Sequence, residues 1–198
     1  LQGSAALGDE PGEEILVGAA DVRRSHADEE DEDSRRQEPF DDADLIALDV
    51  GDGQLHPRLR SDGRVTVLER VNARTVTSLP FAPQIIVCDV SFISATKALP
   101  PLLRLATAGW EAVILVKPQF EAGRTDVKRG VVRDPDVQRN AIGFVVEAAR
   151  AWGGDPVGVV DSGLPGPKGN REFFVHLVNR AAESNPDDIE RWIADAVG

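Results

Sequence analysis

The sequence predicts an α/β fold, built on a mostly parallel β-sheet with an antiparallel last strand. The apolar runs at residues 85–89 and 112–117 are uninterrupted, which is typical of strands covered on both faces. Strand patterns alternate with helical patterns along the chain, and this order favours parallel strands joined by right-handed crossovers. In open α/β sheets functional residues collect where strands end, so Asp89 and Lys117 are expected to lie close together.

The first 44 residues differ from the rest of the chain in charge. They hold 15 acidic and 4 basic residues, whereas residues 45–198 hold 19 and 18. An acidic segment with few large apolar residues cannot bury enough surface to offset its ordering entropy, so a mobile loop is expected. Residues 15–17 are an apolar exception, for which a short strand or a helical turn is expected. Residues 45–198 are expected to form the folded domain.

The composition indicates a cytoplasmic protein with one ordinary domain. A chain of 198 residues with 41% hydrophobic content can bury a sizeable core. No apolar stretch approaches the roughly 20 residues needed to cross a bilayer, so no membrane is expected as a partner. Cys88 is the single cysteine, which excludes an internal disulfide. Its place in an apolar run indicates a small buried hydrophobe rather than a reactive thiol.

Short elements are predicted before and between the two apolar runs. Strands are expected at residues 45–50 and 65–69, and a short helical piece at residues 53–60. A helix is expected at residues 94–106, with Ser94 as its N-cap and Gly109 after its end. Two consecutive prolines inside it, Pro100 and Pro101, predict a kink or a restart.

The clearest helical pattern covers residues 135–152. Asp134 is a good N-cap, Pro135 fits the first turn, and Gly153 follows the end. Its apolar residues at helical spacing are expected to face the core: Val137, Ala141, Phe144, Ala148 and Trp152.

The last part of the chain predicts two strands and a helix. The strands are expected at residues 156–161 and 172–178, and the helix at residues 187–197. The connection between the strands, residues 163–169, is rich in glycine and proline. It suits an antiparallel return better than a helical crossover.

Several common functional motifs are absent from the sequence. There is no G-x-G-x-x-G pattern, no P-loop and no H-E-x-x-H pattern, so dinucleotide and nucleoside-triphosphate binding lack their usual phosphate cradle. The three histidines, His26, His56 and His176, are scattered, and no metal site is predicted.

Some polar residues have two readings on position alone. Asp49 ends the first readable strand, where it could accept two ribose hydroxyl groups or cap the helical piece that follows. Asn72 could offer its amide to a base edge or shape a turn. Lys168 and Arg171 could contact RNA phosphate or simply solvate their loop.

Six blocks of sequence, in order and in spacing, resemble the hemolysin-A-type (TlyA) ribosomal RNA methyltransferases, which are FtsJ-like enzymes. The resemblance covers roughly residues 45–180, and the fourth and sixth blocks are the most specific. The blocks are LIALDVGDGQL at 45–55, LERVNAR at 68–74, CDVSFIS at 88–94, VKPQFEAG at 116–123, GVVRDP at 130–135 and GPKGNRE at 166–172.

The resemblance implies transfer of a methyl group from S-adenosylmethionine to a ribose 2′-hydroxyl of ribosomal RNA, on a Rossmann-like sheet. Asp89, Lys117 and Glu172 match three members of the family's catalytic Lys-Asp-Lys-Glu set, with Lys117 as candidate base. Asp49, Asn72 and Asp89 become the candidate cofactor-binding residues.

The chain contains no methionine, not even at position 1, and it is therefore expected to be a fragment. The resemblance implies which parts are missing. The first catalytic lysine, the first strand, the glycine-rich cofactor loop and an S4-type RNA-binding domain are expected upstream of Leu1. Residues 1–44 would then hold a remnant of the first helix followed by an acidic insertion.

Three other readings remain open at this point. The chain could be a non-catalytic remnant or interaction module that has lost cofactor binding, in which Asp89 and Lys117 form only a rim ion pair worth about 0–1 kcal/mol. A membrane-active protein is disfavoured, since no bilayer-length apolar segment occurs. A base N-methyltransferase could use the D-x-x-F pattern at Asp89 to Phe92, but it would not need Lys117 and Glu172.

Overall fold

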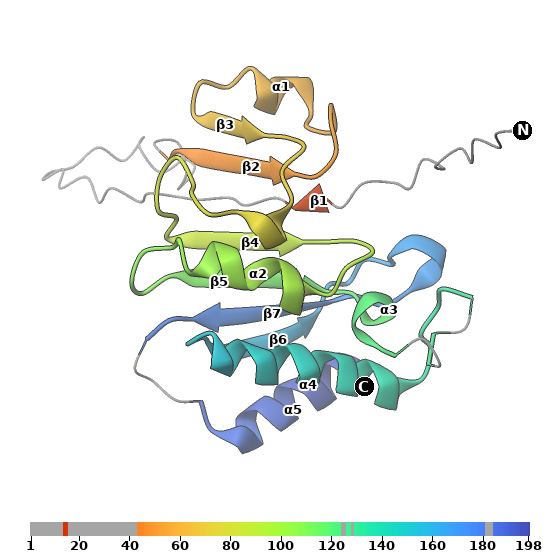
Figure 1. Ribbon diagram of the computed structural model, residues 1–198. Coiled ribbons are helices and arrows are strands. Elements are labelled where there is room, and N and C mark those ends of the chain that lie inside the picture. Colours follow the sequence, from red (N-terminus) through yellow and green to blue (C-terminus); the bar gives the residue numbers. More distant parts are fainter. Residues whose placement is uncertain (1–13, 16–42, 124–125, 128, 181–183) are drawn as a thin grey trace, which may run out of the picture.

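The computed structural model describes residues 14–15, 43–123, 126–127, 129–180 and 184–198 (Figure 1). The helix remnant and the acidic insertion predicted before residue 45 therefore lie almost wholly outside the described residues. Ile15 is an exception, because Glu14–Ile15 forms the two-residue strand β1. In the described part of the chain, no helix has the length and apolar character to span a bilayer.

The larger sheet contains four strands in the order β4-β5-β7-β6. Strands β4 (Ile85–Asp89) and β5 (Glu111–Val116) are parallel. Strand β7 (Phe173–Val178) is antiparallel to β5 and to β6 (Asp155–Asp161), which lies at the edge. The predicted α/β sheet with a reversed last strand is confirmed.

The smaller sheet has the order β1-β2-β3. Strands β2 (Leu45–Asp49) and β3 (Val65–Leu68) are parallel, and β1 is antiparallel to β2. Figure 1 shows β1 between β2 and β4. Among the described residues, no strand pairs with the edge of β4 that faces the smaller sheet. The expectation of a strand before Leu1 stays a prediction.

Helix α2 (Ala95–Leu103) lies between the two apolar strands, as expected. Its N-cap is Ser94, whose side-chain oxygen accepts a hydrogen bond from the backbone N–H of Thr96 at 3.1 Å. Contrary to the prediction of a restart, the helix continues through Pro100 and Pro101. The apolar side of α2 is buried against the core. The free energy of this packing outweighs the cost of the backbone N–H donor that each of the two prolines lacks.

Helix α4 (Pro135–Ala151) begins at its predicted cap, Asp134. The predicted core-facing stripe was partly wrong, because Phe144 is 51% exposed. The helix carries more apolar residues than one stripe can hold, and its bulkiest residue is not on the buried side. The buried residues of the helix are Gln138, Ala141, Ile142, Val145, Val146 and Ala149.

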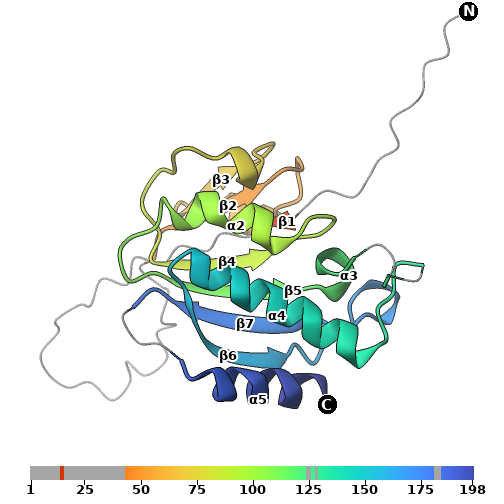
Figure 2. The same cartoon turned by 60° about the horizontal axis from the view of Figure 1, so that its bottom comes forward.

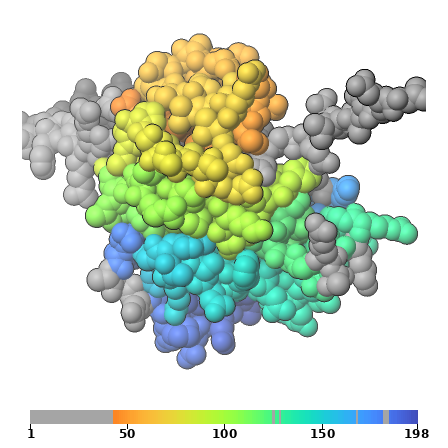
Figure 3. All heavy atoms as spheres, viewed as in Figure 1, coloured from red at the N-terminus to blue at the C-terminus, as the bar shows by residue number. Residues whose placement is uncertain are grey.

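Helices α2 and α4 cover the same face of the larger sheet (Figures 1 and 2). They form a continuous surface in the space-filling view (Figure 3). Helix α5 (Pro186–Val197) packs against β6 and α4. Beneath these helices, Cys88 is fully buried, and burial raises the pKa of its thiol. Its predicted role as a small buried hydrophobe is confirmed.

The remaining elements are short and lie in the connections. They are α1 (Pro57–Arg60), the 3-10 turns η1 (Ala73–Thr75) and η2 (Pro167–Gly169), and α3 (Pro118–Glu121). Helix α3 follows the end of β5 and carries residues of the candidate site, whereas η2 lies just before Glu172 and β7.

Candidate active site

Three residues predicted as catalytic lie at one edge of the larger sheet. Asp89 is the last residue of β4, and Lys117 directly follows β5. Glu172 directly precedes β7. Strand β7 is antiparallel to β5, so Phe173, the first residue of β7, pairs with Val116, the last residue of β5. The strand directions therefore bring an aspartate, a lysine and a glutamate from distant parts of the sequence together.

The Lys117 side chain is held from two sides. Its Nζ lies 2.5 Å from Asp89 Oδ1 and donates a hydrogen bond to Ser91 Oγ at 3.1 Å. The lysine side chain is 10% exposed and that of Asp89 is 40% exposed. Asp89 Oδ1 is buried and accepts no hydrogen bond of normal geometry from a described residue, so the contact is an ion pair at short range. Because the Lys117 side chain is buried, its contact with Asp89 differs from the exposed rim ion pair considered above.

The Glu172 carboxylate is buried beside this lysine. Burial raises the pKa of Glu172, while the charge of Lys117 and a hydrogen bond from the Gln119 side chain partly oppose that rise. Glu172 Oε1 is buried and has no hydrogen-bond partner among the described residues. A Cβ atom at Gly166 would lie 2.2 Å from this oxygen, so only glycine leaves room for the carboxylate here.

Glu121 fixes the loop that follows β4. Its carboxylate accepts hydrogen bonds from Ser94 Oγ at 2.5 Å and from the backbone N–H of Ala95 at 2.7 Å, at the first turn of α2. Burial raises the pKa of Glu121, and these two hydrogen bonds partly oppose the rise. The carboxylate therefore ties α3 to the start of α2.

Phe92 projects from the same loop. Its side chain is 54% exposed, and its φ of 65° is in the left-handed region, which is rare for a bulky residue. Its ring packs on Phe120 of α3, with 5.2 Å between ring centroids. An exposed aromatic ring held in a costly backbone conformation near Lys117 is a feature typical of functional sites.

The segment before Glu172 is anchored by buried amides. Asn170 Oδ1 accepts a hydrogen bond from Val132 N at 3.0 Å, and Asn170 Nδ2 donates to Gly130 O at 2.9 Å. Gln138 Nε2 donates to Val132 O at 3.1 Å. Two of the sequence blocks, at residues 130–135 and 166–172, therefore meet in space.

Arg171 is engaged within the protein. Its guanidinium pairs with Asp161 and donates hydrogen bonds to the carbonyl oxygens of Ala196 at 2.8 Å and Val197 at 2.5 Å. It also lies 5.3 Å from the centroid of the Phe173 ring. These contacts join the end of α5 to the start of β7. The suggested contact of Arg171 with RNA phosphate has no support from this arrangement, whereas Lys168 is exposed.

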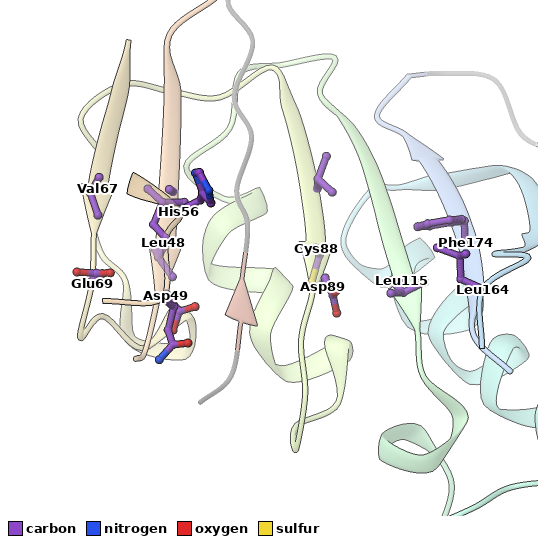
Figure 4. Close-up of a pocket in the computed structure, with 14 residues that line it drawn as sticks. Leu48, Asp49, His56, Val67, Glu69, Cys88, Asp89, Leu115, Leu164 and Phe174 are labelled. Carbon is purple, nitrogen blue, oxygen red and sulfur yellow. The ribbon is translucent and has the colours of Figure 1, made fainter. Parts of the chain in front are cut away.

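A cavity of about 480 Å³ lies between the two sheets (Figure 4). The carboxylates of Asp49, Glu69 and Asp89 line it, and Figure 4 shows them near the strand ends. Most other lining residues are apolar, and no lysine or arginine of the described residues lines it. Asp89 therefore belongs both to the cavity and to the cluster around Lys117. Glu69 pairs with Arg60 and Asp89 pairs with Lys117, whereas Asp49 forms no ion pair with a described residue. A carboxylate in such a lining favours a ligand with hydroxyl or cationic groups over one with phosphates.

The two remaining predicted cofactor residues differ in position. Asp49 lines the cavity, its side chain accepts a hydrogen bond from the backbone N–H of Gly51, and burial raises its pKa. It does not cap α1, whose N-cap is His56. Asn72 does not line the cavity. Its Oδ1 accepts a hydrogen bond from the backbone N–H of Arg74 at 3.0 Å, which shapes the turn η1. Cofactor binding by Asp49 and Asn72 stays a prediction.

Sequence reasoning did not single out Ser91, Gln119 or Phe120. All three lie inside the two blocks around Asp89 and Lys117. The spacing of the blocks was the available signal. Only the fold shows that Ser91 contacts Lys117, that Gln119 faces Glu172 and that Phe120 packs on the Phe92 ring.

A family of known proteins matches most of the chain. Residues 34–179 match the family described as FtsJ-like methyltransferase. The chain belongs to the FtsJ-like methyltransferase family. Among FtsJ-like relatives, it is 45% identical over 161 residues to the 16S/23S rRNA (cytidine-2′-O)-methyltransferase TlyA of Mycobacterium tuberculosis, covering 77% of this chain and 60% of that protein. It is 38% identical over 138 residues to Hemolysin A of Brachyspira hyodysenteriae, covering 68% of this chain and 58% of that protein.

Solved structures show the same family fold. A protein of Lactococcus lactis that carries the name hemolysin has a TM-score of 0.71 at 38% identity, covering 76% of this chain and 75% of that one. A hemolysin-named protein of Streptococcus thermophilus also has a TM-score of 0.71, at 35% identity, covering 76% of this chain and 57% of that one. The expected Rossmann-like methyltransferase fold is confirmed. The chain spans about 60% of the length of the TlyA relative.

Proposed function

We propose that this chain is the catalytic part of a ribosomal RNA methyltransferase that transfers a methyl group from S-adenosylmethionine to a ribose 2′-hydroxyl. The observation that carries the proposal is the buried Lys117, held by Asp89 and Ser91 at the sheet edge beside Glu172. The names of the TlyA relatives, which specify cytidine-2′-O-methylation, support ribosomal RNA as substrate and cytidine as the target nucleotide.

The chemistry of the cavity fits S-adenosylmethionine. This cofactor supplies a methyl group on a cationic sulfur, and it carries ribose hydroxyls and an ammonium group but no phosphate. Asp49 would accept hydrogen bonds from the ribose hydroxyls, and Asp89 would face the cationic part. Asn72, the N-cap of η1 after the neighbouring strand β3, lies outside the lining of the cavity and would contact the adenine base of the cofactor from there. The acceptor-rich lining with no lysine or arginine among the described residues supports this assignment.

The reaction needs an aligned alcohol and a place for its proton. The ribose 2′-oxygen would attack the methyl carbon as its proton passes to Lys117 Nζ, and the carbon–sulfur bond breaks. Asp89 and Glu172 would orient the Lys117 side chain and the ribose of the substrate. Alignment of this kind can supply ~7–11 kcal/mol of the barrier.

Phe92 supports an RNA substrate. Bases that leave their stack are commonly bound on exposed aromatic rings, and the Phe92 ring is exposed near the lysine. We propose that the target base stacks on this ring. A methyltransferase acting on a base would also use such a ring, but it would not need the arrangement of Lys117 and Glu172.

The domain organisation completes the proposal. Residues 45–198 would form most of the catalytic domain, acting in the cytoplasm, with residues 1–44 as helix remnant and insertion. RNA recognition by an S4-type domain would come from sequence upstream of Leu1. The share of the TlyA relative that the chain spans, 60%, leaves room for such a domain.

The proposal is tested with Lys117→Ala and, as a matched control, Lys97→Ala, which changes an exposed lysine of α2. Methyl transfer from labelled S-adenosylmethionine to ribosomal RNA is measured in the intact protein, and cofactor binding by calorimetry. We expect Lys117→Ala to lose roughly 10²–10⁴-fold in rate and to retain cofactor binding, since a positioned base contributes that much. Near-normal turnover would refute the role of Lys117. Absence of cofactor binding in the unmodified protein would favour the non-catalytic remnant.

A further inference from the structure

Gln119 lies beside the proposed catalytic residues, and its side-chain oxygen has no hydrogen-bond partner among the described residues. It lies in the first turn of α3, two residues after Lys117. Its side chain lies close enough to the Glu172 carboxylate to oppose the rise in the pKa of that group. A carboxylate accepts hydrogen bonds, so the donor in this contact is the amide nitrogen of Gln119. The amide nitrogen is therefore the end that faces Glu172, and the oxygen is the other end.

The oxygen of this amide has no partner. Gln119 Oε1 is buried and accepts no hydrogen bond from any described residue, and the same is true of Glu172 Oε1. Two buried acceptors without a donor are costly to leave unpaired. A ligand that offers N–H or O–H groups would satisfy both.

Other buried amides show that the fold does satisfy structural side chains. Asn170 uses both ends of its amide, accepting from Val132 N and donating to Gly130 O. A glutamine whose role was only structural would be expected to pair in the same way. The unpaired oxygen of Gln119 therefore points to a ligand rather than to stability.

We propose that Gln119 is a substrate-positioning residue: its amide nitrogen holds the Glu172 carboxylate, and its carbonyl oxygen accepts a hydrogen bond from the nucleotide whose ribose is methylated. The proposal rests on the proposed function. It extends the site beyond Asp89, Lys117 and Glu172 by a residue that links the substrate to the glutamate. The matching group on the nucleotide is a donor, either the ribose 2′-hydroxyl or an N–H of the base.

Gln119 should also influence the charge of Glu172. The groups that face Glu172 are Lys117, Asp89 and Gln119. The hydrogen bond from Gln119 favours the ionised carboxylate, so its loss should make Glu172 harder to ionise. This effect is measurable without any turnover.

The experiment compares Gln119→Met, which removes both ends of the amide, with Asn179→Leu, which removes a structural amide bonded to Gly109 N and Gly153 O beyond the opposite end of β7 from Glu172. In the intact protein, the side-chain carboxyl carbon of Glu172 is followed by ¹³C NMR against pH, with Glu172→Gln used for assignment. Methyl transfer to ribosomal RNA is measured in parallel. Gln119→Glu, which keeps the side-chain shape and the acceptor but loses the donor, serves if Gln119→Met does not fold.

We expect the carboxyl titration of Glu172 to move to higher pH in both Gln119 variants and to stay unchanged in Asn179→Leu. The kcat should fall about 10- to 100-fold in Gln119→Met, with the KM for S-adenosylmethionine within twofold. An unchanged titration together with unchanged kcat would overturn the inference. A rise in the cofactor KM alone would overturn it too, because the oxygen would then serve the cofactor. If the unmodified protein transferred no methyl group, the proposed function would fail, whereas the titration would still report whether Gln119 holds Glu172.

Discussion

Lys117 Nζ lies 2.5 Å from Asp89 Oδ1, and the lysine side chain is only 10% exposed. The two residues end neighbouring parallel strands, so backbone pairing determines their separation. Asp89 is partly exposed to solvent, whereas Lys117 is buried and held by Asp89 and Ser91. That asymmetry suits a site in which the lysine works on a bound group and the aspartate also lines the neighbouring cavity.

Gly166→Ala should impair catalysis by displacing Glu172. The added Cβ would lie 2.2 Å from Glu172 Oε1, so the carboxylate must move. Displacement of a positioning group by about 1 Å can cost ~10²-fold in rate, so we expect a loss of that order in kcat. Gly63→Ala is the control, because a Cβ there meets nothing within 4 Å. Equal activity of the two variants would show that the position of Glu172 is unimportant.

Phe92→Ala should weaken RNA use while leaving the fold intact. Stacking of a base on an aromatic ring contributes ~1–3 kcal/mol, so kcat/KM for RNA should fall roughly 5- to 150-fold. Phe92→Trp should retain most activity. The matched control is Phe144→Ala on α4, since Phe144 is 51% exposed and Phe92 is 54% exposed. Steady-state kinetics with ribosomal RNA would decide, and equal losses in the two alanine variants would contradict a stacking role.

Glu121→Gln should change how stability depends on pH. Burial raises the pKa of Glu121 above its ordinary value of 4.5, so the folded protein holds this proton more tightly than the unfolded chain does. Unfolding then releases a proton, and the free energy of unfolding falls as pH rises from about 4.5 through the raised pKa. The glutamine variant should lack this part of the fall.

Urea unfolding across the acidic to neutral range tests the Glu121 prediction. The quantity of interest is the difference in unfolding free energy between variant and unmodified protein, which should shift in favour of the variant as pH increases. Glu147→Gln, at an exposed position of α4, provides the comparison. A difference that does not vary with pH would mean that Glu121 does not titrate in this range.

Arg171→Lys should destabilise the protein despite keeping the charge. The guanidinium bonds to Asp161 and to two carbonyl oxygens at the end of α5, and a lysine cannot reproduce this planar set of donors. We expect a loss of ~1–3 kcal/mol in unfolding free energy, measured by urea denaturation. Arg191→Lys is the control, since Arg191 pairs with Asp188 on the exposed side of α5. A change within ~0.5 kcal/mol for both variants would contradict the role of Arg171 in anchoring α5.

The sequence allowed the strands and the convergence of two site residues to be predicted. Apolar runs predicted β4 and β5 correctly, and their ends placed Asp89 beside Lys117. Glu172 came only from the family resemblance, since nothing in its own surroundings in the sequence says that β7 begins at the same edge. The glycine-rich connection did predict the reversed direction of that strand.

Other features depend on tertiary contacts that no local pattern encodes. The core side of α4 was assigned partly wrongly because several apolar stripes compete, and only packing leaves Phe144 outside. The left-handed backbone of Phe92 could not be predicted, because bulky residues rarely adopt it and glycine is the usual signal. The contact of Gln119 with Glu172 joins segments more than fifty positions apart in the sequence.

The direction of β7 makes the proposed catalytic site at this sheet edge sensitive to strand register. Phe173 pairs with Val116, so Glu172 is the next residue beyond the pairing and its reach is set by that match. A slip of two residues along β5 would keep every side chain on its own face but carry the glutamate about 7 Å along the strand. A slip of one residue would turn it to the opposite side of the sheet. Changes in the length of the loop between β6 and β7 are therefore a route by which a member of this family could keep its fold and lose its chemistry.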